Sequence, residues 1–133
     1  MKFLLDTCIC VSLLRHQEPV YSEFFRSFHR EDCVLSAVTV FELRYGALHA
    51  TQASEAKLRA VEALVSQFII VAFDEADAGS AAEIRQELAQ AGTPIGTADL
   101  LIAGIARAHG LTVVTNNEKE FLRVKHLSVK SIR

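Results

Sequence analysis

The chain has 133 residues, of which half are hydrophobic and 23% are charged, and this balance argues against a disordered polypeptide. The length suits one domain over residues 1–133, because it can bury a real core but is too short for two domains. The formal net charge of −2 excludes the basic excess typical of a nucleic-acid-binding protein, so any such contact must be local or helped by a metal ion or a partner.

Short β-rich runs alternate with helical patterns, an order typical of βαβ units with a parallel sheet. In chain order, the first half is expected to contain a strand at Lys2–Leu5, helices at about Cys8–Arg15 and Pro19–Phe28, a strand at Cys33–Ser36, and helices at Ala37–His49 and Ser54–Gln67. The second half is expected to contain a strand at Phe68–Phe73, a helix from the Asp74 cap to Ala91, a helix from the Thr97 cap to His109, a strand at Thr112–Thr115, a helical turn at Glu118–Val124 and a strand at Leu127–Ile132. The pattern predicts one compact α/β unit.

Three cysteines, Cys8, Cys10 and Cys33, lie in apolar surroundings without the spacing of a metal finger, so we expect buried free thiols in a reducing cytosol. The N-terminal apolar stretch is interrupted by Asp6 and lacks an obvious small-residue cleavage site. No segment is long and apolar enough to cross a bilayer. These features predict a soluble, cytoplasmic protein with no membrane partner.

Four acids occupy comparable places relative to the expected strands. Asp6 ends the first strand, and Glu42 follows the second. Asp99 lies at the start of a helix, and Glu120 comes shortly after the fourth strand. Ligands of an open parallel sheet bind beyond the carboxyl ends of its strands, so we expect these acids to converge.

Each acid also has an ordinary structural explanation. Asp6 could cap the helix that follows it. Glu42 could complete a capping box with Thr39, unless that helix begins earlier and projects Glu42 toward Asp6. Asp99 could interact with the helix dipole, although an unpaired carboxylate is costly in so apolar a helix. Glu120 could be an exposed turn residue.

The case for a site depends on the acids as a set. Two carboxylates about 4 Å apart repel by about 4 kcal/mol at an effective dielectric constant near 20, so several in one crevice need a cation or raised pKa values. Mg²⁺ or Mn²⁺ suits oxygen ligands. The five histidines lack a zinc-binding spacing and are expected at the surface. Asp74 and Asp77 form an ordinary acidic helix start outside this set.

Four runs of sequence carry a family likeness: Leu5-Asp6-Thr7, residues 38–47 around Glu42, residues 95–103 around Asp99, and residues 115–124. Together and in this order they resemble the PIN-domain family, and within it the VapC toxins of bacterial toxin–antitoxin pairs. The likeness covers essentially the whole chain. It implies a three-layer α/β/α sandwich with a mainly parallel sheet of about five strands.

The resemblance also implies an activity and partners. The implied activity is that of a Mg²⁺- or Mn²⁺-dependent endoribonuclease, the toxin of a type II toxin–antitoxin system, with transfer RNA as a suggested substrate. The implied partners are a small VapB-like antitoxin, which neutralises the enzyme in a larger complex, and a second copy of the chain in a homodimer.

The family's acids fall on Asp6, Glu42 and Asp99. Many relatives carry a fourth acid where this chain has Asn117, and the nearest carboxylate is Glu120, so either residue could occupy that position. Asp6 and Asp99 are expected to bind one or two metal ions directly. Glu42 is expected to bind through water or to orient the nucleophile in phosphodiester hydrolysis by metal-activated water.

Other side chains near the acids have supporting roles in this hypothesis. Hydrogen bonds to ligands or substrate are expected from Thr7, Thr115, Asn116 and Asn117. Cys8 replaces a common family Asn, and because a thiol is a poor Mg²⁺ ligand we expect it to pack instead. The basic residues expected to meet RNA are Arg123, Lys125, His126, Lys130 and Arg133, with Arg44 as a further candidate.

Three alternatives share parts of the pattern. A receiver-like regulatory module also has an acid at its first strand end, but Asp6 has no adjacent acid partner. A phosphatase with an aspartyl nucleophile normally has a second Asp where this chain has Cys8. A non-catalytic antitoxin-binding module with a degenerate metal site stays open because of Asn117.

Overall fold

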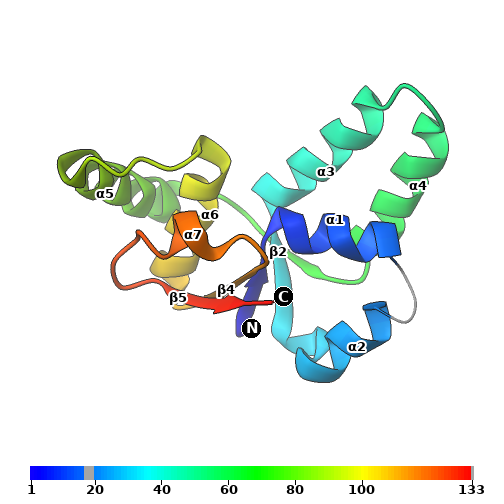
Figure 1. The fold of residues 1–133 in the computed structure, drawn as a ribbon, viewed down its shortest axis with the longest axis horizontal. Helices are drawn as coiled ribbons and strands as arrows, with labels where there is room; N and C mark the ends of the chain where they lie inside the picture. The colour runs from blue at the N-terminus through cyan, green and yellow to red at the C-terminus, as the bar shows by residue number, and fades with distance from the viewer. Residues whose placement is uncertain (17–19, 133) are drawn as a thin grey trace.

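A five-stranded sheet forms the centre of the computed structural model, which describes residues 1–16 and 20–132 (Figure 1). The strands are β1 (Phe3–Leu5), β2 (Cys33–Ser36), β3 (Ile69–Val71), β4 (Thr112–Thr115) and β5 (Ser128–Ser131), in the spatial order β3-β2-β1-β4-β5. Every neighbouring pair is parallel. The prediction of a parallel sheet of about five strands is confirmed.

Helices cover both faces of this sheet (Figure 1). One layer contains α1 (Thr7–His16), α2 (Val20–Ser27), α3 (Ala37–His49) and α4 (Ser54–Val65), and the other contains α5 (Glu75–Ala91), α6 (Thr97–His109) and α7 (Glu118–Phe121). A 3₁₀ turn at Arg30–Asp32 leads into β2. The three-layer α/β/α architecture is therefore confirmed.

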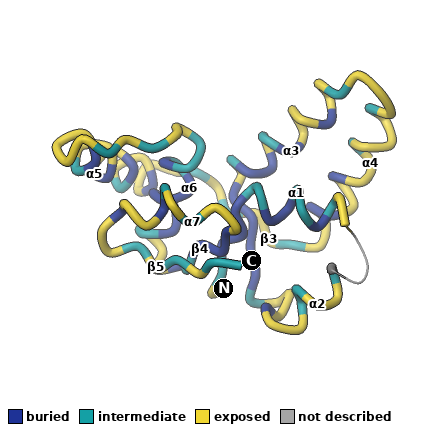
Figure 2. Tube along the Cα trace, viewed as in Figure 1, coloured by how far each residue is buried: buried dark blue, intermediate teal, exposed yellow. Residues whose placement is uncertain are grey.

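The three central strands bury both of their faces. Adjacent residues point into opposite layers, and the pairs that do so are Leu4 and Leu5 on β1, Val34 and Leu35 on β2, and Val113 and Val114 on β4. The first residue of each pair packs with α5, α6 and α7, and the second packs with the other helical layer. Figure 2 shows this core as buried central strands with exposed outer helical turns. Continuous apolar runs are what a parallel sheet covered on both sides requires.

The strand order reverses its direction beside β1, between β1 and β4. From β1 the chain moves outward to β2 and β3, and it then returns to β4 on the other side of β1. This reversal is the topological switch point at which open α/β sheets bind ligands. Asp6 directly follows β1 and Asn116 directly follows β4, so the fold brings two segments of the predicted site together.

The start of α6 differs from the expectation. Gly96 is the N-cap and Thr97 is the first helical residue, so the prediction that Thr97 caps this helix is wrong. The N–H of Leu100 bonds to the Gly96 carbonyl at 2.9 Å and closes the first turn one residue earlier than expected. Asp99 still lies in that first turn.

Other boundaries shift by a few residues. The strand expected at 68–73 is limited to Ile69–Val71, and α7 ends at Phe121, with turn residues after it. The expected helix start at Pro19 lies outside the described residues. The cap at Asp74, with Gly92 at the end of α5, is as predicted.

Helices α5 and α6 approach each other closely at Gly104. A Cβ at this position would lie 2.8 Å from the Cβ of Ala81, so the contact leaves no room for a side chain.

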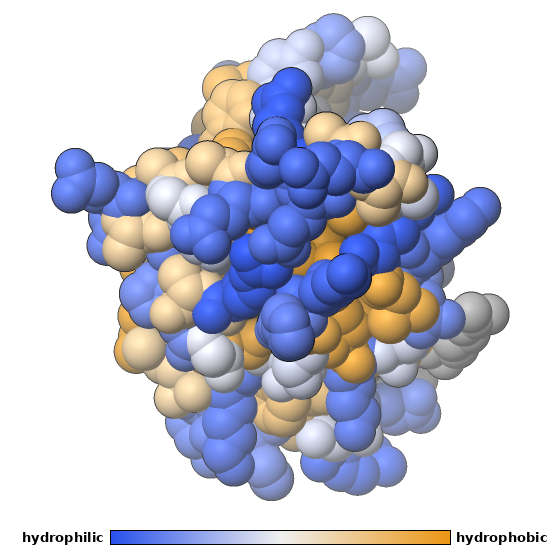
Figure 3. Space-filling model, turned by 90° about the vertical axis from the view of Figure 1, so that its left-hand side faces the viewer, coloured by the Kyte–Doolittle hydropathy of each residue, from blue (hydrophilic) through white to orange (hydrophobic). Residues whose placement is uncertain are grey.

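Hydrophilic side chains dominate the middle of the outer α5 face, with apolar patches beside them (Figure 3). Across residues 1–16 and 20–132, none of the helices has the length and apolar character needed to span a membrane.

Candidate active site

Asp6 is fixed at the end of β1 by three hydrogen bonds. Its side chain is buried, with 4% exposed. One carboxylate oxygen accepts the Thr7 N–H at 2.7 Å. The other accepts the Thr115 hydroxyl at 2.9 Å and the Cys8 thiol at 3.0 Å. The N–H groups of Ile9 and Cys10 bond to the backbone carbonyl of Asp6 instead, so the carboxylate is held beside β4 rather than used as the helix cap.

Glu42 projects from the second turn of α3 toward the same edge. The Ser36 hydroxyl caps this helix by accepting the Thr39 N–H at 3.0 Å, so the capping box proposed for Thr39 and Glu42 is wrong. The Glu42 carboxylate instead accepts the Thr7 hydroxyl at 2.5 Å. A charge-assisted bond of this length links the start of α1 to α3.

Asp99 and Glu120 are joined by a side-chain hydrogen bond. Burial, together with this bond, raises the pKa of the Asp99 carboxyl to about 8. The negative charges of Asp6 and Glu42 act in the same direction. The bond with Asp99 lowers the pKa of Glu120, whose carboxylate also accepts the Gly96 N–H at 3.4 Å. Of this pair, Asp99 is therefore the acid whose protonated form is favoured near neutral pH.

Three of the four acids line one cleft of about 500 Å³: Asp6, Glu42 and Asp99. Glu120 joins this group through its bond to Asp99. The polar remainder of the cleft wall consists of Thr7, Cys8, Ser12, Arg15, His16, Asn116 and Asn117. Thr115 is buried beneath it, where its hydroxyl donates to Asp6 and accepts the Asn117 N–H at 2.9 Å. The predicted site residues are thus brought together.

Cys8 does more than pack. Its thiol donates to Asp6, and burial, reinforced by the Asp6 charge, raises its pKa to about 11. It therefore remains protonated at neutral pH. Cys10 and Cys33 are buried, whereas Cys8 is only partly buried, and all three are free thiols.

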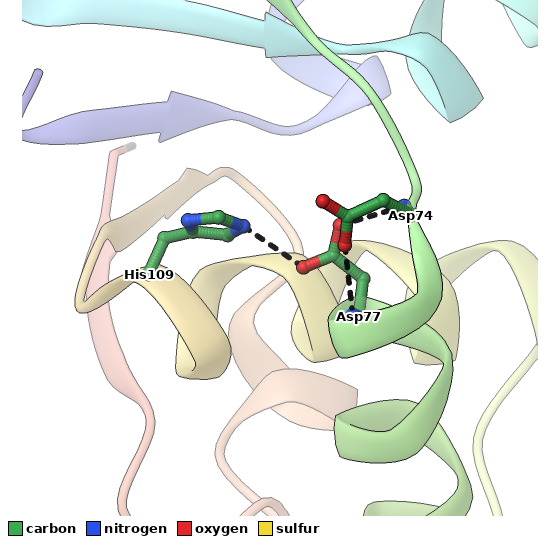
Figure 4. Close-up of side chains that lie close together, drawn as sticks. All are labelled: Asp74, Asp77 and His109. Atoms are coloured by element: carbon green, nitrogen blue, oxygen red, sulfur yellow. Dashed lines mark hydrogen bonds and ion pairs between the residues drawn. The ribbon is translucent and has the colours of Figure 1, made fainter.

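A second acidic group lies elsewhere, at the start of α5 (Figure 4). Asp74 and Asp77 form a reciprocal capping box. The fully buried Asp77 also bonds to the His109 ring at 2.9 Å. These oxygen and nitrogen atoms are close enough to hold a cation, but their bonds join the start of α5 to the end of α6. The interpretation of Asp74 and Asp77 as a helix start is confirmed.

The family comparison agrees with this geometry. The model of the PIN domain matches residues 3–127. The chain belongs to the PIN-domain family. A receiver-like module is therefore excluded.

This PIN domain has relatives of nearly the same length. It is 41% identical over 124 residues to the tRNA(fMet)-specific endonuclease VapC of Shigella flexneri, covering 93% of this chain and 92% of the relative. It is 33% identical over 132 residues to Ribonuclease VapC2 of Rickettsia felis, covering 98% of each. Among solved structures, a DNA-bound VapBC complex from Salmonella typhimurium matches with a TM-score of 0.92 at 36% identity, covering 98% of both chains. VapBC2 from Rickettsia felis, bound to a promoter DNA fragment, matches with a TM-score of 0.91 at 30% identity and full coverage of both chains.

Among the described residues, the basic side chains expected to meet RNA do not line the cleft of this PIN domain. Arg44 is occupied by a bidentate bond to Glu62, with both distances 2.9 Å. Arg123 donates to the Pro94 carbonyl at 2.8 Å. Three more are exposed elsewhere, namely Lys125, His126 and Lys130, and Arg133 lies outside the described residues. All five histidines are exposed, as predicted.

Sequence reasoning missed three polar cleft residues on α1: Ser12, Arg15 and His16. Ser12 and Arg15 lie four and seven positions after Cys8, and this spacing places Cys8, Ser12 and Arg15 on one side of a helix. Helical periodicity counted from Cys8 could have found Ser12 and Arg15. They give the acidic cleft a basic and hydroxyl-bearing wall.

Proposed function

We propose that this protein is a divalent-metal-dependent endoribonuclease and the toxin of a VapC-type toxin–antitoxin pair. The observation that carries the proposal is the convergence of Asp6, Glu42 and Asp99 in one cleft at the switch point of the sheet. The similarity to proteins named endonuclease VapC and ribonuclease VapC supports the same activity.

The donor set of the cleft fits Mg²⁺ or Mn²⁺. Both ions prefer oxygen ligands, and Asp6 and Asp99 would hold them. The raised pKa of Asp99, caused first by burial and then by its acidic neighbours, reflects a cost of negative charge that a cation would offset. When bound, such an ion lowers the pKa of a coordinated water and neutralises charge developing at phosphorus. Asn117 and Glu120 remain the two candidates for the fourth position.

The other side chains have distinct roles in the proposal. Glu42 orients the attacking water or binds the ion through water, and the Thr7 hydroxyl holds Glu42 in place. Thr115 fixes Asp6. The amides of Asn116 and Asn117 lie on the cleft wall, where they can hydrogen-bond to the RNA backbone or bases.

RNA is the proposed substrate, with transfer RNA as its class, and Arg15 supplies a local positive charge beside the cleft. This placement fits a chain with a net charge of −2, because phosphate contact needs no basic excess over the whole surface. A VapB-like antitoxin would cover the acidic cleft and bring an Arg into bidentate contact with its carboxylates. The solved VapBC complexes support a partner of this kind.

A homodimer is the proposed assembly, and the exposed face of α3 supports it. Phe41, Tyr45 and Leu48 are 66%, 57% and 64% exposed, and Phe41 stacks on Tyr45. They border an apolar groove of about 550 Å³ that continues to Ile70 on the edge strand β3. Apolar patches of this kind mark interaction surfaces. Phe41→Lys should therefore shift sedimentation from dimer to monomer, whereas Leu122→Lys, an equally exposed leucine at the end of α7, should leave the assembly unchanged.

Expression in a bacterial host tests the toxin role. The wild-type chain should arrest growth, a co-expressed antitoxin should restore it, and Asp6→Asn should be harmless at the same level of folded protein. Harmless expression of folded wild type would count against the proposal.

A further inference from the structure

Three hydroxyl groups form a chain that leads from the core to Glu42. The Ser36 hydroxyl donates to the Thr39 hydroxyl at 3.3 Å. The hydroxyl oxygens of Thr39 and Thr7 are 3.0 Å apart, and the Thr7 hydroxyl donates to Glu42 at 2.5 Å. Ser36 and Thr39 are both 0% exposed, so water does not compete for the bond between their two hydroxyls.

The direction of every hydrogen bond in this chain follows from counting protons. Each hydroxyl has one proton, and an ionised carboxylate can only accept. Because the Thr7 proton is used on Glu42, the contact between Thr7 and Thr39 requires the Thr39 proton. The Ser36 proton then completes the chain, while the Ser36 oxygen accepts the Thr39 N–H at 3.0 Å. All three hydroxyl protons therefore point toward Glu42.

The same arrangement determines the place of Glu42 relative to Asp6. Thr39 and Glu42 are one turn apart on α3, and the Thr7 hydroxyl lies between them. Thr7 is the residue directly after Asp6, and its own N–H holds the Asp6 carboxylate. The segment Asp6-Thr7 thus fixes the orientation of two carboxylates, those of Asp6 and Glu42. Hydroxyl groups whose hydrogen bonds run in one direction also strengthen one another through polarisation.

We propose that Ser36 and Thr39 are positioning residues that fix the Thr7 hydroxyl and, through it, the orientation of the Glu42 carboxylate for RNA cleavage. The inference rests on the proposed function, which gives Glu42 its catalytic role. A Glu side chain has several rotatable bonds, and Glu42 is only partly buried, so it would otherwise sample unproductive rotamers.

Two substitutions at Thr39 separate positioning from packing. Thr39→Val keeps the shape and removes the hydroxyl, whereas Thr39→Ser keeps the hydroxyl and removes a methyl group. Thr39→Val should lower kcat by about 10–100-fold with little change in KM, as the loss of an outer partner of a metal site does. Thr39→Ser should retain most of the activity. If Thr39 only packs, Thr39→Ser should be the more harmful change, because it leaves a cavity.

The chain offers a matched control at Thr112. Its hydroxyl donates to Ser128 at 3.0 Å between β4 and β5, outside the residues that line the cleft. Thr112→Val removes the same kind of bond and should leave kcat within about twofold of wild type. If Thr39→Val fails to fold by circular dichroism, Thr7→Val applies the same test at a partly exposed position and should lower kcat at least as far.

Failure of this inference differs from failure of the proposed function. Wild type without metal-dependent cleavage overturns the proposed function, whereas active wild type and an equally active, folded Thr39→Val overturn the positioning role. A crystal structure of Thr39→Val tests the orientation without any activity. Glu42 in a new rotamer supports the inference, and Glu42 still bonded to Thr7 in the same place overturns it.

Discussion

The side chains of Asp99 and Glu120 share a hydrogen bond that lowers the pKa of Glu120 and adds to the effect of burial in raising the pKa of Asp99. Burial and the nearby negative charges of Asp6 and Glu42 disfavour the ionised form of Asp99. Glu120 is held ionised chiefly by the Asp99 bond. Metal binding by Asp99 at neutral pH would therefore release a proton. The affinity of the site for a metal ion would then depend on pH through the protonation of Asp99.

The stability of the metal-free protein should depend on Asp99 between about pH 4 and pH 8. Burial raises the pKa of Asp99 from 3.8 to about 8, so the folded state holds an extra proton in this window. Stability falls with rising pH wherever the folded state binds more protons, so the unfolding free energy should decrease across the window. Urea unfolding in EDTA at a series of pH values measures this slope. An equal slope in Asp99→Asn would assign it to other groups.

Asp99→Asn should preserve the fold and abolish function. The metal-free variant should melt at or above the wild-type temperature at pH 8, because repulsion among the acids is relieved. The increase in Tm on adding Mn²⁺ and the cleavage of RNA should both be lost. Thermal melts with and without Mn²⁺, together with cleavage rates, provide the measurement.

Asp74→Asn is the matched control for Asp99. Asn is as good an N-cap as Asp, so this variant should lose only the charge interactions of Asp74 with the helix dipole and His109, and its stability should change little. Its Mn²⁺ response and cleavage rate should equal those of wild type. Equal losses in both variants would contradict the assignment of Asp99 to the site.

The strand ends and the layers could be predicted from sequence because they depend on local patterns. Short apolar runs followed by acids placed Asp6 and Glu42 at the same edge, and the sheet confirmed their convergence. The bond between Asp99 and Glu120 could not be predicted in this way. It depends on how α7 packs against α6, which no periodicity encodes.

Single polar atoms were harder to predict than elements. The sequence indicated a packed thiol at Cys8, but its proton is directed at Asp6 because β1 and β4 bring Thr115 and Asp6 to the same point. The cap of α6 was also missed, since Thr and Gly are about equally good N-caps by residue type and only the backbone geometry selects Gly96 over Thr97.

The cysteine thiols should react slowly in the folded protein. Burial raises the pKa of Cys8 and of Cys33 to about 11 and raises the pKa of Cys10 further, so little thiolate exists at pH 8. A thiol-specific chromogenic disulfide should give a slow trace with native protein and a rapid release equal to three thiols in denaturant. A rapid native reaction abolished by Cys8→Ser would show that this thiol is activated instead.

Gly104→Val should destabilise the fold by overpacking the contact between α5 and α6. The added atoms would meet the Cβ and backbone of Ala81, and such overpacking costs about 1–3 kcal/mol. Gly79→Ala on α5 is the control, because nothing lies within 4 Å of a Cβ there and alanine favours a helix by roughly 0.5–1 kcal/mol. Chemical denaturation should show opposite signs for the two variants.

The most direct test of the central claim is cleavage of total bacterial RNA by the purified chain, with Asp6→Asn purified in parallel as the control for contaminating nuclease. With Mn²⁺ or Mg²⁺, wild type should produce discrete fragments, EDTA should stop cleavage, and excess Mn²⁺ should restore it, while Asp6→Asn stays inactive throughout. Undiminished cleavage in EDTA, or equal cleavage by Asp6→Asn, would contradict a metal-dependent nuclease site built on Asp6, Glu42 and Asp99.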